Sequence, residues 1–185
     1  MCIRDSLDTV PVEVDLADCS ASGSWVGGVS VLGGGVQSVT MDCPPLSDKD
    51  VHIAGLPTLH LKASPTYDGG QVFVELQDAE TGLRLGHATM DVRYHAGGYD
   101  PQTVVPGSDL TLLMEFQGLD VLLPAGHGLR LVMTETGEDY LAPACGLSCP
   151  VHVIAEGSML TLPTVERDGS GEFLTPQSAD AANNA

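Results

Sequence analysis

The chain has 185 residues, with 25 acidic and 7 basic side chains, and its formal net charge is -18 at pH 7. So acidic a balance disfavours binding to nucleic acid or to anionic membrane surfaces. No apolar run approaches the roughly 18–20 residues that a membrane helix needs, so we expect no membrane span. The length suits a single domain of the all-β kind.

The two ends of the chain are expected to lie outside the main domain. Residues 1–6 match one reading frame of a common transposase sequencing adapter, so we expect an assembly scar here and a natural start further upstream. Residues 7–38 are expected to hold one strand and a Gly/Ser-rich linker, and 39–166 the main β-sandwich. Residues 167–185 are rich in small and polar residues, which predicts a disordered tail.

Alternation of apolar and polar residues with a period of two dominates the chain and predicts strands. Residues 10–16 alternate in this way and are expected to form a half-buried first strand. Residues 20–35 are rich in Gly and Ser and are expected to be a loop. A strand over 36–41 is expected to stop at Cys43 and the two prolines that follow it.

Further short strands follow at regular intervals, at 51–53, 58–63, 71–77, 83–94, 109–116, 119–123, 129–135, 151–154 and 159–162. In 83–94 we expect Leu83, Leu85, Met90 and Val92 to face inward, with a β-bulge near Gly86. No stretch carries the i, i+3, i+4, i+7 spacing of a capped helix. Many short strands between Gly/Pro turns predict an all-β fold, a β-sandwich or jelly roll.

Four cysteines lie outside residues 1–6, and they allow three complete pairings. Cys19 can pair with Cys43, and Cys145 can pair with Cys149 across a short loop. An even count favours an oxidising compartment, so an extracellular location is one expectation, although the compartment stays open. A zinc site is the other interpretation, but the tight two-pair spacing of zinc ribbons is absent.

The chain lacks the sequence pattern of a hydrolase active site. It has no Gly-x-Ser-x-Gly elbow, and no histidine pair at i, i+4 as in metalloproteases. His127 lies in an expected turn and is predicted to donate a hydrogen bond to nearby backbone. A structural cation among Asp91, Asp100 and Glu138 is an open alternative. We therefore predict no catalytic, cofactor-binding or metal-binding residue in this chain.

Several segments, taken in order, resemble the C-terminal, non-catalytic domain of Xaa-Pro dipeptidyl-peptidases and CocE/NonD serine hydrolases. The resemblance spans roughly 39–165, and its best segments are 43–57, 73–78, 90–94 and 125–131. The last of these, an Ala-Gly-His turn before Leu-Arg-Leu, is the closest match.

Two departures stand out from this resemblance. Gly128 replaces an arginine or another polar residue of the family. At 134–138, Thr-Glu-Thr-Gly-Glu replaces the family's Ser-Ser-Asp-x-Pro. The loop that faces the catalytic domain is therefore expected to differ here.

The resemblance implies a jelly roll of galactose-binding-like topology, packed beside an upstream α/β-hydrolase domain that supplies the nucleophile, acid and histidine. The parent protein would cleave peptides after an Xaa-Pro N-terminus, or esters and amides, and this chain alone would be inactive and without cofactor. The implied partner is the missing catalytic domain, and assembly into a homo-oligomer through the parent enzyme is left open.

Two other functions stay open at this point. The chain can be a free-standing module that binds a carbohydrate or another ligand, although aromatic residues for a sugar platform are scarce. It can also be a structural module of a cell-surface protein. If a hydrolase domain is the partner, the face that meets it is expected to be exposed and apolar, with Leu113, Leu122 and Leu141 as candidates.

Overall fold

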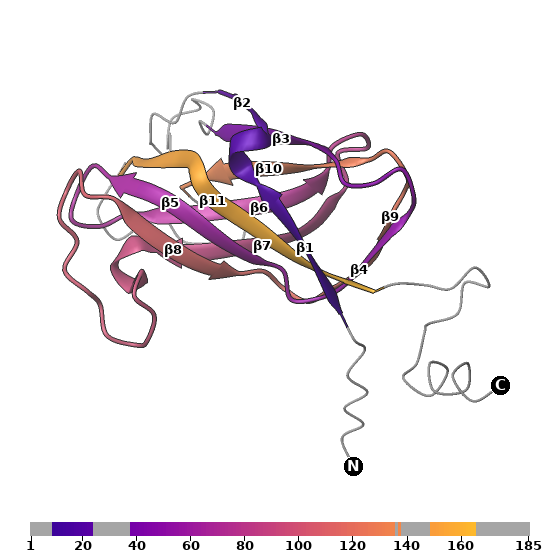
Figure 1. Cartoon of the computed structure of the whole chain (residues 1–185). Helices are drawn as coiled ribbons and strands as arrows, with labels where there is room; N and C mark the ends of the chain where they lie inside the picture. The colour runs from indigo at the N-terminus through magenta and orange to yellow at the C-terminus, as the bar shows by residue number, and fades with distance from the viewer. Residues whose placement is uncertain (1–8, 24–37, 136, 138–148, 166–185) are drawn as a thin grey trace, which may run out of the picture.

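The computed structural model describes residues 9–23, 38–135, 137 and 149–165. These residues form two antiparallel sheets packed face to face as a β-sandwich (Figure 1). The helical elements among them are two single turns of 3-10 helix, η1 (Leu16–Asp18) and η2 (Val92–Tyr94). The predicted all-β class is confirmed, and no described helix is long and apolar enough to span a membrane.

The first sheet has the order β8-β5-β11-β4-β9, with β1 paired to β11. Its strands are β1 (Val10–Asp15), β4 (Val51–Gly55), β5 (Thr58–Pro65), β8 (Leu110–Glu115), β9 (Leu119–Leu123) and β11 (Val151–Val165). The second sheet has the order β2-β3-β10-β6-β7. Its strands are β2 (Ser20–Ser22), β3 (Val39–Pro45), β6 (Gln71–Asp78), β7 (Arg84–Asp91) and β10 (Gly128–Thr134).

The first sheet has a break in its middle. β4 pairs with β9 and β5 pairs with β8, so that β4 and β5 follow one another along the sheet beside β9 and β8. A backbone hydrogen bond of 2.9 Å from Phe116 N to the Pro57 carbonyl bridges this break. Gly55 takes φ +133° there, with the Pro163 side chain 3.0 Å from the place of a Cβ atom. Only glycine meets both conditions without strain.

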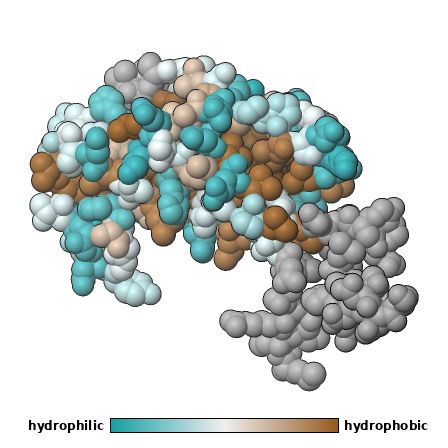
Figure 2. Space-filling view, in the orientation of Figure 1, coloured by the Kyte–Doolittle hydropathy of each residue, from teal (hydrophilic) through white to brown (hydrophobic). Residues whose placement is uncertain are grey.

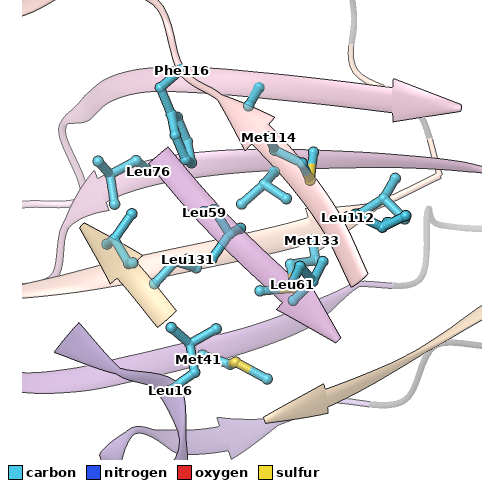
Figure 3. Close-up of a cluster of buried hydrophobic side chains, with 14 of the residues drawn as sticks. Leu16, Met41, Leu59, Leu61, Leu76, Leu112, Met114, Phe116, Leu131 and Met133 are labelled. Atoms are coloured by element: carbon cyan, nitrogen blue, oxygen red, sulfur yellow. The ribbon is translucent and has the colours of Figure 1, made fainter. Parts of the chain in front are cut away.

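The core lies between the sheets and follows from the alternation in the sequence (Figure 3). In β10 and β6, every second residue is fully buried, and the facing strands β5 and β8 do the same. Side chains with at most 1% exposure include Leu59, Leu61, Leu76, Leu112, Met114, Leu131 and Met133. Each buried side chain of this size stabilises the fold by roughly 1.5–3 kcal/mol, which makes this layer the main source of stability.

Three differences from the predicted strands have local causes. β3 continues through Pro44 to Pro45, because β2 pairs with β3 only as far as Asp42 and leaves one side of the prolines unpaired. The predicted strands 151–154 and 159–162 are one strand, β11, with an irregular register between Ile154 and Met159. β2 occupies Ser20–Ser22, inside the segment that was expected to be a loop.

The bulge predicted in 83–94 is confirmed in β7. The register against β6 shifts so that Leu76 faces Gly86 while Gln77 faces Arg84. The inward assignment of Leu83 is wrong, because that residue lies in the turn before β7 and is 61% exposed. The predicted strand also ends early, at Asp91, whose carboxylate accepts a hydrogen bond from Arg93 N and begins η2.

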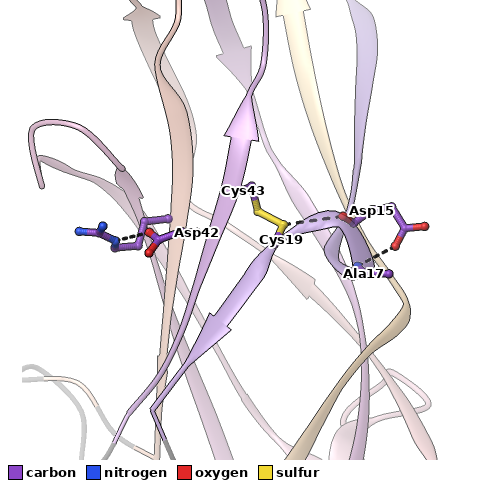
Figure 4. The surroundings of a disulfide bond; sticks show 6 residues. Asp15, Ala17, Cys19, Asp42 and Cys43 are labelled. Carbon is purple, nitrogen blue, oxygen red and sulfur yellow. Dashed lines mark hydrogen bonds and ion pairs between the residues drawn. A yellow bond between two sulfur atoms is a disulfide. The ribbon is translucent and has the colours of Figure 1, made fainter.

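A disulfide anchors the N-terminal segment to the sandwich (Figure 4). β1 adds a strand to the first sheet and β2 adds one to the second, with η1 between them. Leu16 of η1 is fully buried in the core. Cys19, just after η1, is bonded to Cys43 of β3, which confirms that predicted pair. Cys149 is disulfide-bonded as well, and Cys145 lies outside the described residues.

Candidate functional site

Three turns meet at one end of the sandwich, and we call this end the turn end. They are the β3–β4 turn (46–50), the β6–β7 turn (79–83) and the β9–β10 turn (124–127). The β9–β10 turn is bound to the β3–β4 turn by backbone hydrogen bonds from Gly126 N to the Ser47 carbonyl and from Leu46 N to the His127 carbonyl. The turn end is therefore a connected structure rather than three independent loops.

Asp78, the last residue of β6, organises the β6–β7 turn. Its side chain is buried, and its Oδ1 accepts a hydrogen bond of 3.0 Å from Glu80 N. Its Oδ2 accepts one of 2.7 Å from the Thr81 hydroxyl. An aspartate at the start of a turn commonly bonds to backbone two residues ahead in this way. Asp78 thus fixes the path of the chain from β6 into β7.

His127 joins the β9–β10 turn to Asp78. Its Nδ1 lies 3.0 Å from Asp78 Oδ2 and 3.1 Å from Oδ1. The expectation that His127 donates to nearby backbone is wrong, because the fold places a carboxylate 49 residues away within its reach. Glu80 adds a second link, since its Oε2 accepts a hydrogen bond of 2.9 Å from Gly128 N. We call Asp78, Glu80 and His127 the turn latch.

The charge state of Asp78 suits this role. Burial acts to raise its pKa, but the hydrogen bonds from Thr81 and His127, and those from the backbone N–H groups of Glu80 and Thr81, outweigh burial. The pKa of Asp78 falls to about 2 as a result. The carboxylate is therefore ionised at neutral pH, where an anionic acceptor makes its strongest hydrogen bonds.

The donor atoms of the turn latch lie close enough together to hold a metal ion, within 4.8 Å of one another. Yet both Asp78 oxygens already accept hydrogen bonds, and His127 Nδ1 points at one of them. This geometry joins two turns by direct contact. The turn latch is thus a structural link between strands of the second sheet.

The described residues do not form the cation site among Asp91, Asp100 and Glu138 that the sequence left open. Asp91 is paired with Arg93, whose Nε lies 3.0 Å from Oδ1. Burial acts to raise the pKa of Asp91, but the hydrogen bonds from Arg93 outweigh it and hold the pKa below its ordinary value. Asp100 is exposed, and Glu138 lies outside the described residues.

A groove of about 760 Å³ lies at the turn end, where β1 starts and β11 ends. We call it the terminal groove. Its lining comes from β1, the β3–β4 turn, β4, β9 and β11, and comprises Val12, Leu46, Ser47, Lys49, Asp50, Val51, His52, Leu122, Thr164 and Val165. Its size is within the range of ligand and peptide sites. The sequence did not indicate this groove.

Several polar groups of the terminal groove are already bonded within the domain. His52 is buried, and its Nε2 lies 2.6 Å from Oδ1 of the exposed Asp120. The Thr164 hydroxyl donates to the Val10 carbonyl at 2.6 Å. Asp50 Oδ1 accepts a hydrogen bond of 2.9 Å from Ala125 N. The groove as a whole is lined by five aliphatic residues and five polar or charged ones, and the polar ones include Ser47 and Lys49.

The exposed leucines named from the sequence lie on the outer side of the first sheet. Leu113 of β8 is 54% exposed and Leu122 of β9 is 46% exposed, while Leu141 lies outside the described residues. Only Leu122 lines the terminal groove. In Figure 2, hydrophobic side chains gather on the right half of this face, where Figure 1 places β4 and β9.

The aromatic residues that the structure describes do not gather into one platform. Phe116 is in the core, and Phe73 is buried and stacked on His87 with ring centroids 5.3 Å apart. Tyr67 and Tyr99 are exposed, at 52% and 99%. Trp25, Tyr140 and Phe173 lie outside the described residues.

Comparison with solved structures identifies the same sandwich in larger proteins. An aminopeptidase from the marine sediment archaeon Thaumarchaeota archaeon matches with a TM-score of 0.57 and 11% identity, covering 87% of this chain and 34% of that one. An α-amino acid ester hydrolase matches with a TM-score of 0.56 and 16% identity, covering 88% and 33%. A CocE/NonD family hydrolase from Staphylococcus aureus matches with a TM-score of 0.57 and 12% identity, and the match covers 87% of this chain and 37% of that one.

At these identities the likeness shows the fold alone, and the chain spans about a third of the length of those structures. No curated protein matches the sequence. The family profile described as the X-Pro dipeptidyl-peptidase C-terminal non-catalytic domain, however, matches residues 36–143, more than half of the chain. The turn latch lies inside that match, at 78, 80 and 127. The chain therefore belongs to the family of X-Pro dipeptidyl-peptidase C-terminal non-catalytic domains.

Proposed function

We propose that this domain is the accessory β-sandwich of a serine hydrolase whose catalytic residues reside in an α/β-hydrolase domain that precedes it. The observation that carries the proposal is the family match, which is to a C-terminal and non-catalytic domain. The similar solved proteins are an aminopeptidase and ester or CocE/NonD hydrolases, each about three times as long as the matched part. The parent reaction is accordingly hydrolysis of an Xaa-Pro peptide, or of an ester or amide.

The finer topology forms part of the proposal. We assign the sandwich to the jelly-roll class with galactose-binding-like connectivity. Two antiparallel sheets, with connections that cross from one sheet to the other such as those from β3 to β4 and from β5 to β6, support this assignment. In this class the loops at either end of the sandwich are available for contacts, while the sheets supply a rigid frame.

The domain acts by packing rather than by chemistry. Its polar clusters link its own elements: the turn latch joins two turns, and Arg93 pairs with Asp91 beside η2. A rigid sandwich packed on a catalytic domain restricts the motion of that domain and borders access to its active site. The domain itself contributes no catalytic, cofactor-binding or metal-binding residue in this proposal.

Recovery of the coding DNA upstream of residue 7 from the same source tests the proposal directly. A continuous frame with a Gly-x-Ser-x-Gly elbow, followed by an aspartate and a histidine, supports it. A stop codon or an unrelated domain immediately upstream refutes it. In parallel, the purified chain is expected to leave Xaa-Pro p-nitroanilides and p-nitrophenyl esters unhydrolysed.

The same purified chain tests the alternative of a carbohydrate-binding module. Titration calorimetry with a panel of sugars is expected to show no heat of binding. Saturable binding that is lost in Tyr99→Ala would favour the carbohydrate module, because Tyr99 is the most exposed aromatic residue described.

A further inference from the structure

We infer that the terminal groove is the seat of the upstream catalytic domain of the same polypeptide. This inference rests on the proposed function and goes beyond it, because it names the surface. The occupant is a segment of the catalytic domain that inserts apolar side chains between the β3–β4 turn and the strands β1, β9 and β11. Position, chemistry and exposure of the groove each support it.

The position of the groove follows from the pairing of the first and last strands. Val10, the first residue of β1, faces Thr164 of β11, and the two are joined by the Thr164 hydroxyl. Thr164 and Val12 both line the groove. A domain that is N-terminal to Val10 therefore enters the sandwich beside the groove. The covalent connection makes this contact intramolecular, so that even a modest surface is occupied.

The aliphatic part of the groove provides a contact for apolar side chains of the catalytic domain, beside polar groups that include Ser47 and Lys49. Half of its lining residues are aliphatic, namely Val12, Leu46, Val51, Leu122 and Val165. The side chains of His52, Asp50 and Thr164 are engaged by Asp120, Ala125 and Val10. Burial of aliphatic surface needs no free polar partner, whereas a sugar would need several.

The groove carries charges of both signs, since the exposed Lys49 and Asp50 line it and the exposed Asp120 is bonded to the lining residue His52. We therefore expect the catalytic domain to present apolar side chains flanked by charged ones that match Lys49 and Asp50. Charge complementarity of this kind sets the register of a contact more than its strength.

Leu122 is the side chain that best reports on this surface. It is 46% exposed and lies beside the buried His52, its partner in the β4–β9 register. Leu113 is a matched control, because it is a leucine of similar exposure, 54%, in β8, which follows the same line of strands as β9. It lies outside the groove.

The experiment compares hydrogen exchange in the full-length parent protein and in the present chain. In the full-length protein, peptides covering 46–52 and 119–123 are expected to exchange at least tenfold more slowly than in the chain. Peptides covering 110–115 should exchange equally in both. Leu122→Glu in the full-length protein should abolish the slowing, whereas Leu113→Glu should preserve it. If Leu122→Glu does not fold, Leu122→Thr replaces it in this test, because threonine is compatible with a strand. It too should abolish the slowing.

Failure of the inference and failure of the proposed function are distinguishable. If the parent protein hydrolyses its substrate but 46–52 and 119–123 gain no protection, the inference is wrong and the proposed function stands. If the parent contains no hydrolase domain, the proposed function fails. Protection already present in the isolated chain and lost on deletion of residues 166–185 would make the C-terminal segment the occupant. A dimer of the chain that Leu122→Glu dissociates would make a second copy the occupant, and both results overturn the inference.

Discussion

His127 Nδ1 lies 3.0 Å from Asp78 Oδ2, and this contact joins two of the segments that resemble the family. Asp78 ends the segment 73–78, and His127 lies in the Ala-Gly-His turn of 125–131. β6 and β10 are neighbours in the second sheet, so the end of one strand and the turn before the other lie side by side. The two segments are thus parts of one structural unit.

Asp78→Asn is expected to lower the free energy of unfolding by about 1–3 kcal/mol, the usual cost of removing a charged acceptor from buried hydrogen bonds. The amide keeps the shape of the side chain but loses the negative charge that binds Thr81 and His127. Urea denaturation followed by circular dichroism measures the change. Asp48→Asn, at an exposed position, is the control and should change stability by less than about 0.5 kcal/mol. Equal effects of the two variants would contradict a role for the turn latch.

The contribution of Asp78 is expected to depend on pH in a defined window. Its pKa in the folded protein is about 2, below the ordinary value of 3.8, so the ionised form is favoured by folding. The stabilisation is complete above pH 3.8 and is lost as the pH falls towards 2. The difference in unfolding free energy between wild type and Asp78→Asn should therefore shrink from pH 5 to pH 2. A difference that stays constant over this range would show that the charge of Asp78 is not responsible.

Removal of the Cys19–Cys43 disulfide is expected to destabilise the domain by about 3 kcal/mol, because it frees a loop with a sequence separation of 24 residues in the unfolded chain. The double variant Cys19→Ser/Cys43→Ser is preferable to a reductant, since Cys149 is disulfide-bonded as well. Chemical unfolding of both proteins in oxidising buffer gives the difference. Addition of a reductant should then lower the free energy of unfolding of the wild type more than that of the variant. A larger loss in the variant would contradict a stabilising role of the Cys19–Cys43 disulfide.

Gly128→Ala is expected to destabilise the domain by about 1–3 kcal/mol, as overpacking does. A Cβ atom at Gly128 would lie 2.4 Å from the Cys43 carbonyl oxygen, so β3 or β10 would have to move. Gly118→Ala is the matched control, because the nearest atom to its Cβ, in Leu56, is 3.8 Å away. Thermal unfolding of the two variants should show a lowered midpoint for Gly128→Ala alone. If Gly128→Ala leaves the midpoint of thermal unfolding unchanged, β3 and β10 have room for a Cβ atom at this position, contrary to the structure.

The sequence predicted most strands because half-buried strands alternate, and alternation is a local property. β9 agrees with its predicted range of 119–123, and β6 and β10 agree to within one residue. The prolines of β3 misled the prediction, since whether a proline ends a strand depends on whether the neighbouring strand needs its N–H group. The pair Cys19–Cys43 was one of several pairings that the sequence allowed.

The sequence by itself determined the all-β class and the approximate strands, because both depend on periodicity along the chain. It also indicated the family, through segments that resemble the family's own in the same order. Only the tertiary structure decided that Asp78 binds His127, that Leu122 lines a groove while Leu113 does not, and that Val10 lies beside Thr164. These contacts join residues 49 and 154 positions apart, and their partners are set by the order of strands in the sheets. Strand order arises from packing of the whole core, which no local pattern encodes.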